Sequence, residues 1–306
     1  MPVSYARLAA LAAVYVMWGS TYLAIAIAVK TLPPLIMAGL RFVVAGALML
    51  LWLRLTGTPL PNRKQWAAAL LVGTLLLLGG NGMVCLVAHA VPSGIVALII
   101  ACTTLAMVGV GWAAGGPPPT RRLSLGIVLG LIGILVLVWH PGAAAEYPWW
   151  GIAALMTACV CWAGGSVVSR RLSPAAAIAS PWMATAAQML AGGTVVLLAA
   201  TVHGEWADFT PAHFSAVSLA AWAYLVVGGS IIGFGSYVWL LRHTSAALAT
   251  SYGYVNPLVA IVLGAWLNAE PVTPQMLWSA LIILSAVALI ATAAGQDAAV
   301  RNDRDA

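Results

Sequence analysis

The amino-acid sequence predicts an all-α polytopic membrane protein, with ten transmembrane helices arranged as two inverted five-helix repeats around a central cavity. Three observations lead to this prediction: the apolar composition, the lengths of the apolar segments and the distribution of charge between the loops. Of the 306 residues, 63% are hydrophobic and only 7% are charged, whereas a soluble domain carries about 25% charged residues. Soluble proteins keep most charged residues at their surface, so the solvent that matches this chain is lipid.

The apolar segments have the length that a membrane-spanning helix needs, which is about 20 residues. Turn-forming Pro and Gly residues separate most of them. The predicted helices are residues 6–28, 34–54, 66–87, 92–113, 123–140, 149–169, 179–202, 217–240, 245–267 and 276–294. The first has no convincing cleavage site, so we expect a retained membrane helix rather than a signal peptide. We expect the polar tail from Gln296 to be disordered.

The loops between these segments alternate in charge. One set of loops, together with the two termini, carries 11 of the 13 Lys and Arg residues: Arg7, Arg54, Arg63, Lys64, Arg121, Arg122, Arg170, Arg171, Arg242, Arg301 and Arg304. The opposite loops combine Lys30 with the acidic residues Glu146, Glu205, Asp208 and Glu270. Basic loops remain on the cytoplasmic side, which predicts that both termini are cytoplasmic. The basic residues form no patch on a polar domain, so the net charge of +6 does not indicate a nucleic-acid partner.

Two parts of the chain resemble each other in the same order, which indicates an internal repeat. The aligned pairs are Trp18–Ser20 with Trp162–Gly164, Pro34–Gly46 with Pro181–Gly193, Gly80–Gly82 with Gly233–Gly235, and Val91–Ala97 with Thr244–Thr250. Each half has five predicted helices, and an odd number inverts the second half in the membrane. We assign residues 6–140 to the first repeat, 149–294 to the second and 295–306 to a cytoplasmic tail. Inverted repeats are typical of secondary transporters; a duplication that only builds a stable bundle is the alternative.

Four short motifs add a family resemblance that covers residues 6 to 294. They are Met17-Trp-Gly-Ser-Thr-Tyr22, Leu40-Arg-Phe42, Asn256-Pro-Leu258 and Leu267-Asn-Ala-Glu270. They resemble the EamA family of the drug/metabolite transporter superfamily and, within it, bacterial aromatic amino-acid exporters of the YddG type. The resemblance implies a ten-helix, multi-pass carrier of the bacterial inner membrane. The first repeat departs from the pattern, because Thr104 stands where the second repeat has Pro257 and no Glu follows that helix.

Aromatic and polar residues of the first and sixth predicted helices are the first candidates for substrate binding. Trp18 and Tyr22 lie one turn apart on one face, with Trp18 near mid-membrane. Trp usually anchors at the headgroups, so Trp18 either packs, faces lipid or forms the wall of a cavity for apolar or aromatic side chains. Trp162 shares a face with Ser166. Lipid offers a Ser no hydrogen-bond partner, so we expect this face to point inward.

Four residues complete the predicted substrate site: Asn81, Tyr237, Tyr252 and Asn256. Asn81 lies among glycines, and a carboxamide at mid-membrane needs a partner, either a neighbouring helix or the substrate. Tyr252 and Asn256 share a face of the ninth helix. The following Pro257 frees a backbone carbonyl one turn earlier, which faces a wet cavity or is satisfied by a Ser or Thr; a kink that serves only packing is the alternative.

Arg41 is an ionised side chain that the sequence places well inside a helix. A charge at this depth is by default a hypothesis about function. Arg41 either holds a substrate carboxylate or extends to the membrane surface and donates to loop carbonyls. We favour the structural role, because Gln188 occupies the equivalent position of the other repeat and the second helix is expected at the periphery.

The remaining expectations concern function as a whole. The sequence shows no catalytic set, metal cluster or nucleotide-binding motif, and no Asp or Glu inside a predicted helix. We therefore expect no enzyme, cofactor or metal, and downhill transport or exchange rather than tight proton coupling. The expected partners are the lipid bilayer and amino acids, with large apolar or aromatic ones preferred, exported by a monomer or weak homodimer. Alternatives are another metabolite or drug as substrate, or a non-transporting scaffold or sensor.

Overall fold

The structure is a computed structural model that describes residues 5–116, 118–138, 147–244 and 251–305. Every regular element in this part of the chain is a helix, and it contains no strand. The helices overlap all ten predicted ranges. The ends of two of those ranges, residues 139–140 and 245–250, lie outside the described residues.

The helices fall into two runs along the chain. The first run consists of α1 (Tyr5–Ala28), α2 (Pro34–Leu55), α3 (Arg63–Gly73), η1 (Thr74–Gly82), α4 (Met83–Val87), α5 (Ser93–Ala101), α6 (Thr103–Ala113) and α7 (Arg121–Val138). The second run consists of α8 (Trp149–Arg170), α9 (Pro181–His203), η2 (Glu205–Ala207), η3 (Pro211–His213), α10 (Ala216–Tyr224), η4 (Leu225–Ile232), α11 (Gly233–His243), α13 (Tyr252–Asn268) and α14 (Pro274–Asp305).

Seven stretches of the described chain are long and apolar enough to cross a membrane. They are Tyr5–Ala28, Pro34–Leu55, Arg63–Val87, Ser93–Ala113, Trp149–Arg170, Pro181–His203 and Ala216–Leu240. Val255–Asn268 and Pro274–Leu289 are shorter apolar helices. The chain is therefore a helical, multi-pass membrane protein, and the count of ten spans stays a prediction.

The structure differs from the sequence prediction at the start of the third helix and at the end of the chain. The third helix begins at Arg63 rather than at residue 66, because Asn62 and Gln65 form a capping box: the Asn62 side chain accepts from the Gln65 N–H at 3.0 Å, and the Gln65 side chain accepts from the Asn62 N–H at 2.9 Å. The tail predicted to be disordered from Gln296 is helical, since α14 continues to Asp305.

Two long helices change their winding at equivalent places. Residues Thr74–Gly82 and Leu225–Ile232 form π-helical turns, η1 and η4, in the third helix of each half. The π-helix is rare and occurs mostly at functional sites. In the repeat alignment Gly80 matches Gly233, so the two π-helical turns overlap. From the sequence, the glycines around Asn81 indicated close backbone approach or a bend, but not a π-helical turn.

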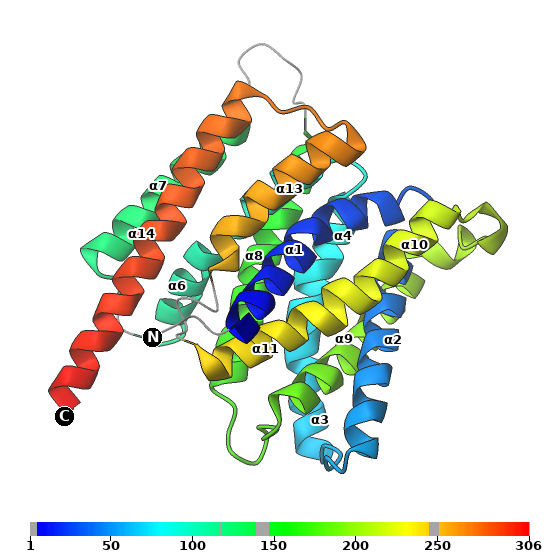
Figure 1. Ribbon diagram of the computed structural model, residues 1–306, viewed down its shortest axis with the longest axis horizontal. Helices are drawn as coiled ribbons and strands as arrows, with labels where there is room; N and C mark the ends of the chain where they lie inside the picture. The colour runs from blue at the N-terminus through cyan, green and yellow to red at the C-terminus, as the bar shows by residue number, and fades with distance from the viewer. Residues whose placement is uncertain (1–4, 117, 139–146, 245–250, 306) are drawn as a thin grey trace.

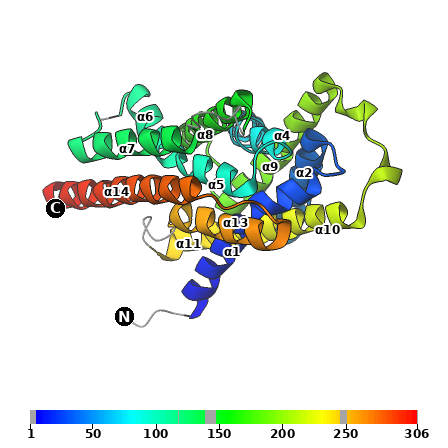
Figure 2. The same ribbon diagram turned by 90° about the horizontal axis from the view of Figure 1, so that it is seen from above.

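Equivalent helices of the two halves pack against each other. Helix α2 lies along α9, and α7 lies along α14, with α1, α5 and α13 between the two pairs (Figures 1 and 2). The α2–α9 contact is close because of two repeat-related glycines. A Cβ atom on Gly46 would come within 2.7 Å of the Leu190 backbone nitrogen of α9, and one on Gly193 within 2.9 Å of the Val43 nitrogen of α2. Small residues permit such close approach of membrane helices.

Two carboxylates of the second half bind helix N-termini of the first half, at the end of the bundle where α1 ends and α2 begins. Glu205, 6% exposed, accepts hydrogen bonds from the Leu35 and Ile36 N–H groups at 2.9 Å, at the start of α2. Glu270 accepts from the Ser93 hydroxyl at 2.9 Å, at the start of α5. A carboxylate is favoured at a helix N-terminus by the free N–H groups and the helix dipole.

Candidate functional site

Trp18 lies in the middle of α1 and contacts the π-helical turn of the other half. Its indole Nε1 donates a hydrogen bond to the Gly229 carbonyl at 3.0 Å. The indole also covers Gly233, where a Cβ atom would come within 2.7 Å of the indole Cδ1. Trp18 therefore needs glycine at this point of the facing helix.

Three further rings surround Trp18. The ring centroids of Phe234, Tyr237 and Tyr252 lie 5.1, 5.2 and 4.7 Å from its own, and those of Tyr237 and Tyr252 lie 5.6 Å from each other. These spacings and the edge-on angles are typical of favourable aromatic pairs. We refer to Trp18, Phe234, Tyr237 and Tyr252 as the aromatic cluster. All four are only half-buried, so apolar ring surface remains available.

The sequence prediction named three of these four residues but not Phe234. One signal pointed to it, because Phe234 stands between the two glycines that align with Gly80 and Gly82 of the first half. Its role depends on packing against Trp18, which is 216 positions away in the chain. A single sequence does not reveal such a contact.

Trp162 makes the mirror-image contact in the other direction. It lies on α8 of the second half and packs against Gly80 in the π-helical turn of the first half, where a Cβ atom would come within 2.9 Å of its Cε3 atom. Trp18 of the first half packs against Gly233 of the second. Both the tryptophans and the glycines are aligned pairs, so one contact occurs twice, once in each direction across the halves.

Three other predicted residues, Ser166, Asn81 and Tyr22, are not members of the aromatic cluster. The Ser166 hydroxyl donates to the Trp162 carbonyl at 2.8 Å within α8. The Asn81 side chain accepts from the Cys85 thiol, with 3.5 Å between oxygen and sulfur. Tyr22 is half-buried and packs against the main hydrophobic core of the bundle. Ser166 therefore lies one turn after Trp162 on α8, and Asn81 follows the glycine of η1 that Trp162 contacts.

Asn256 lies on α13, one turn after Tyr252. Its side chain is 5% exposed, and its Oδ1 atom has no hydrogen-bond partner among the described residues. A buried carbonyl oxygen without a partner costs free energy, so this atom is available to a ligand that donates a hydrogen bond.

Arg41 extends from α2 into the bundle, so the sequence-based orientation toward the membrane surface was wrong. It is 2% exposed, and its Nε donates to the Ser230 hydroxyl at 2.9 Å. Its guanidinium carbon lies 4.8 Å from the centroid of the Phe42 ring. The helix pairing explains the difference, because α2 packs against η4, which carries Ser230.

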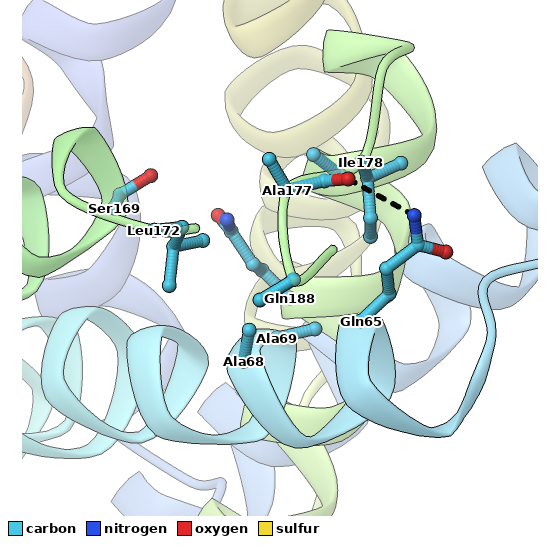
Figure 3. A pocket seen from close by; sticks show the side chains of 10 residues that line it. Gln65, Ala68, Ala69, Ser169, Leu172, Ala177, Ile178 and Gln188 are labelled. Atoms are coloured by element: carbon cyan, nitrogen blue, oxygen red, sulfur yellow. Dashed lines mark hydrogen bonds between the residues drawn. The ribbon is translucent and has the colours of Figure 1, made fainter. Parts of the chain in front are cut away.

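A small pocket lies near the start of α3 and the turn between α8 and α9 (Figure 3). The side chains of Gln65, Ser169 and Gln188 border it, and Gln65 donates to the Ala177 carbonyl at 2.9 Å. Its volume is about 90 Å³, whereas ligand pockets measure roughly 300–1,000 Å³. None of the eight predicted substrate residues lines it, so we do not assign it as the substrate site.

Comparison with known proteins decides the family. The sequence pattern of the EamA-like transporter family matches residues 6–139 and again residues 149–292. The chain belongs to the EamA-like transporter family. Membership in a transporter family also argues against an enzyme.

Two curated proteins are similar to this chain over most of their length. The chain is 41% identical, over 92% of its length and 89% of that protein, to the "Uncharacterized inner membrane transporter YedA" of Escherichia coli (strain K12). It is 23% identical, over 89% of its length and 90% of that protein, to the "Probable amino-acid metabolite efflux pump" of Salmonella typhimurium (strain LT2). Among solved structures, one with 19% identity shares the fold, with a TM-score of 0.62 over 94% of this chain and 97% of that one.

Proposed function

We propose that this EamA protein is a secondary transporter of the bacterial inner membrane that exports amino acids, with large apolar or aromatic ones preferred. The aromatic cluster carries this proposal. Four half-buried rings gathered around Trp18, which lies in the middle of α1, offer an apolar surface that suits the side chain of such a substrate. One relative carries the name of an amino-acid metabolite efflux pump, which supports the same substrate class.

The proposed mechanism is alternating access between two inverted halves. The reciprocal Trp18–Gly233 and Trp162–Gly80 contacts support it, because two similar interfaces can exchange conformations when one half rocks against the other. Both termini are then cytoplasmic. Eleven of the 13 basic residues lie on their side of the membrane.

We propose downhill transport or exchange rather than tight proton coupling. Proton-coupled carriers place ionisable acids inside the membrane. Glu205 and Glu270 lie at one end of the bundle, where both are engaged by helix N-termini. An apolar site discriminates weakly between similar side chains, by about 1–3 kcal/mol for a methylene group, so we expect a broad set of substrates.

Uptake of a panel of labelled amino acids into proteoliposomes that contain the purified protein tests this function. We expect saturable uptake of phenylalanine, tryptophan and leucine that exceeds uptake of glycine, with little change when a pH gradient is imposed. Liposomes without protein are the control. A panel in which no amino acid enters above this control contradicts the proposed substrate class, and strict dependence on a pH gradient contradicts the proposed lack of coupling.

A further inference from the structure

The guanidinium of Arg41 is a buried cation without a counter-ion. Among the residues that the structure describes, no carboxylate lies within ion-pair distance of it, and its Nη1 atom has no hydrogen-bond partner. Only Nε is engaged by a side chain, that of Ser230. Arginine stays protonated in proteins, and an unpaired charge inside a membrane protein is costly.

The guanidinium is adjacent to the aromatic cluster, separated by one glycine. The Gly229 carbonyl accepts the hydrogen bond from the Trp18 indole. On its other side, a Cβ atom on Gly229 would lie 2.9 Å from the Arg41 Nη2 atom and 3.2 Å from the Thr21 hydroxyl. The lack of a side chain at position 229 therefore lets the guanidinium pack directly against the η4 backbone, at the residue whose carbonyl binds the ring that we propose as the side-chain site.

We propose that Arg41 binds the α-carboxylate of the transported amino acid and that Ser230 positions the guanidinium. This inference rests on the proposed function. The positive charge of Arg41 and the planar fork of its N–H groups match a carboxylate better than they match a neutral group of the substrate. Ser230 is fully buried and holds Nε, which leaves the outer edge of the guanidinium free to donate.

In this proposal, the side chain and the ammonium group of the amino acid also have binding partners. The aromatic cluster takes the side chain, and the unpartnered Oδ1 atom of Asn256 accepts a hydrogen bond from the ammonium group. Asn256 lies one turn from Tyr252, which contacts Trp18. Because Arg41 is 2% exposed in this structure, the carboxylate reaches it only when the surrounding helices separate, as alternating access requires.

The test compares phenylalanine with phenylalaninamide, which lacks the carboxylate charge. In wild-type proteoliposomes, we expect phenylalaninamide to compete with labelled phenylalanine about tenfold to a hundredfold more weakly than unlabelled phenylalanine does, the range expected for hydrogen bonds to a charged group. Equal competition by the two compounds overturns the proposal and does not require any variant to fold.

Variants locate this discrimination. We expect Arg41→Gln to remove the preference for phenylalanine over phenylalaninamide and Arg41→Lys to keep part of it. We expect Ser230→Ala to raise the KM for phenylalanine and to leave kcat unchanged, as for a positioning residue. Gln188→Leu is the matched control, because Gln188 is the repeat counterpart of Arg41, and it should keep the wild-type preference. An Arg41→Gln protein that keeps the full preference overturns the proposal.

A binding measurement separates this proposal from the transport function. The melting temperature of the purified wild-type protein should rise with phenylalanine and much less with phenylalaninamide, and Arg41→Gln should lose the difference. Absence of uptake together with this carboxylate-dependent stabilisation contradicts the proposed function but supports the carboxylate site. Uptake without any carboxylate preference supports the function but overturns the site.

Discussion

The surroundings of Trp18 and of Trp162 share a backbone arrangement and differ in chemistry. Each tryptophan packs against an aligned glycine of the other half, Gly80 within the π-helical turn η1 and Gly233 directly after the π-helical turn η4. Phe234 follows the glycine beside Trp18, whereas Asn81 follows the glycine beside Trp162. Tyr237 and Tyr252 add two more rings on the Trp18 side. Duplication thus produced a symmetric framework, and only one side of it carries the aromatic surface.

This difference assigns separate tasks to the two sites. We assign the tryptophan–glycine contacts, which both sites share, to the exchange of conformations. We assign the additional rings, which only the Trp18 site has, to substrate binding. Arg41 follows the same rule, because its repeat counterpart Gln188 is uncharged and borders a pocket too small for most ligands. We therefore expect substitutions of shared features to impair transport in general, and substitutions of unshared features to change substrate preference.

The largest effect is expected for Trp18→Ala. The variant loses the ring on which the substrate side chain is proposed to pack, and burial of a large apolar side chain is worth roughly 1.5–3 kcal/mol, so the KM for phenylalanine should rise about tenfold to a hundredfold. Trp162→Ala should lower uptake several-fold without changing the preference among amino acids. Proteoliposome uptake measures both. Wild-type rates in both variants would show that neither tryptophan belongs to the transport path.

The second test crowds the shared contact. In Gly233→Ala the new methyl group would collide with the Trp18 indole, which three rings and one hydrogen bond hold in place. Overpacking of this kind costs about 1–3 kcal/mol, so the melting temperature and the uptake rate should both fall. Gly80→Ala should have the same effect on Trp162 to a smaller extent, because no such set of rings surrounds Trp162 among the residues that the structure describes. Unchanged melting temperatures in both variants would contradict the reciprocal contact.

A smaller effect is expected when the unshared residues are exchanged. Phe234→Asn places in the second half the residue that the first half has at this position. It removes one ring pair from Trp18, worth about 0.5–1.5 kcal/mol, so uptake of phenylalanine should fall several-fold while uptake of alanine stays constant. Asn81→Phe is the matched control and should leave the preference unchanged. Equal loss for both amino acids in Phe234→Asn would indicate a structural role for this ring.

The smallest effect is expected for Trp18→Phe. An aromatic ring remains, but the hydrogen bond from the indole to the Gly229 carbonyl is lost, which costs about 0.5–1.5 kcal/mol. The melting temperature should fall by a few degrees. Phenylalanine uptake should stay within about threefold of wild type, because the ring surface proposed to contact the substrate remains and only a loss below about 1 kcal/mol is expected for binding. A loss as large as that of Trp18→Ala would mean that the hydrogen bond, rather than the ring, is what transport requires.

Much of the fold followed from the sequence because lipid imposes simple requirements. Segments of about 20 apolar residues predict helices, and helices overlap every predicted range. The predicted end of the last helix was wrong, because polar composition was taken as disorder, whereas α14 continues through this polar segment. The π-helical turns were missed because the glycine-rich segments around Gly80 and Gly229 indicate close approach or bending, but not which hydrogen-bonding pattern the backbone adopts.

The candidate site was predicted less completely, because it is built from contacts between distant segments. Trp18, Tyr237 and Tyr252 were named for their positions on separate helices, and the structure brings them together. The direction in which Arg41 points depends on the packing of α2 against η4, which no local pattern encodes. The Glu205 cap was missed for the same reason, since its partner N–H groups are 169 and 170 positions away.

The binding of Glu205 and Glu270 to helix N-termini has a consequence for the movement of the two halves. The Glu205 carboxylate accepts from the Leu35 and Ile36 N–H groups, and Glu270 accepts from Ser93, so both join the second half to the first at one end of the bundle. Any movement that separates the halves at that end must break these charge-assisted bonds together, at a cost of about 1.5–3 kcal/mol for each bond that water does not replace. These bonds therefore oppose opening of this end, and neither carboxylate belongs to the proposed substrate site.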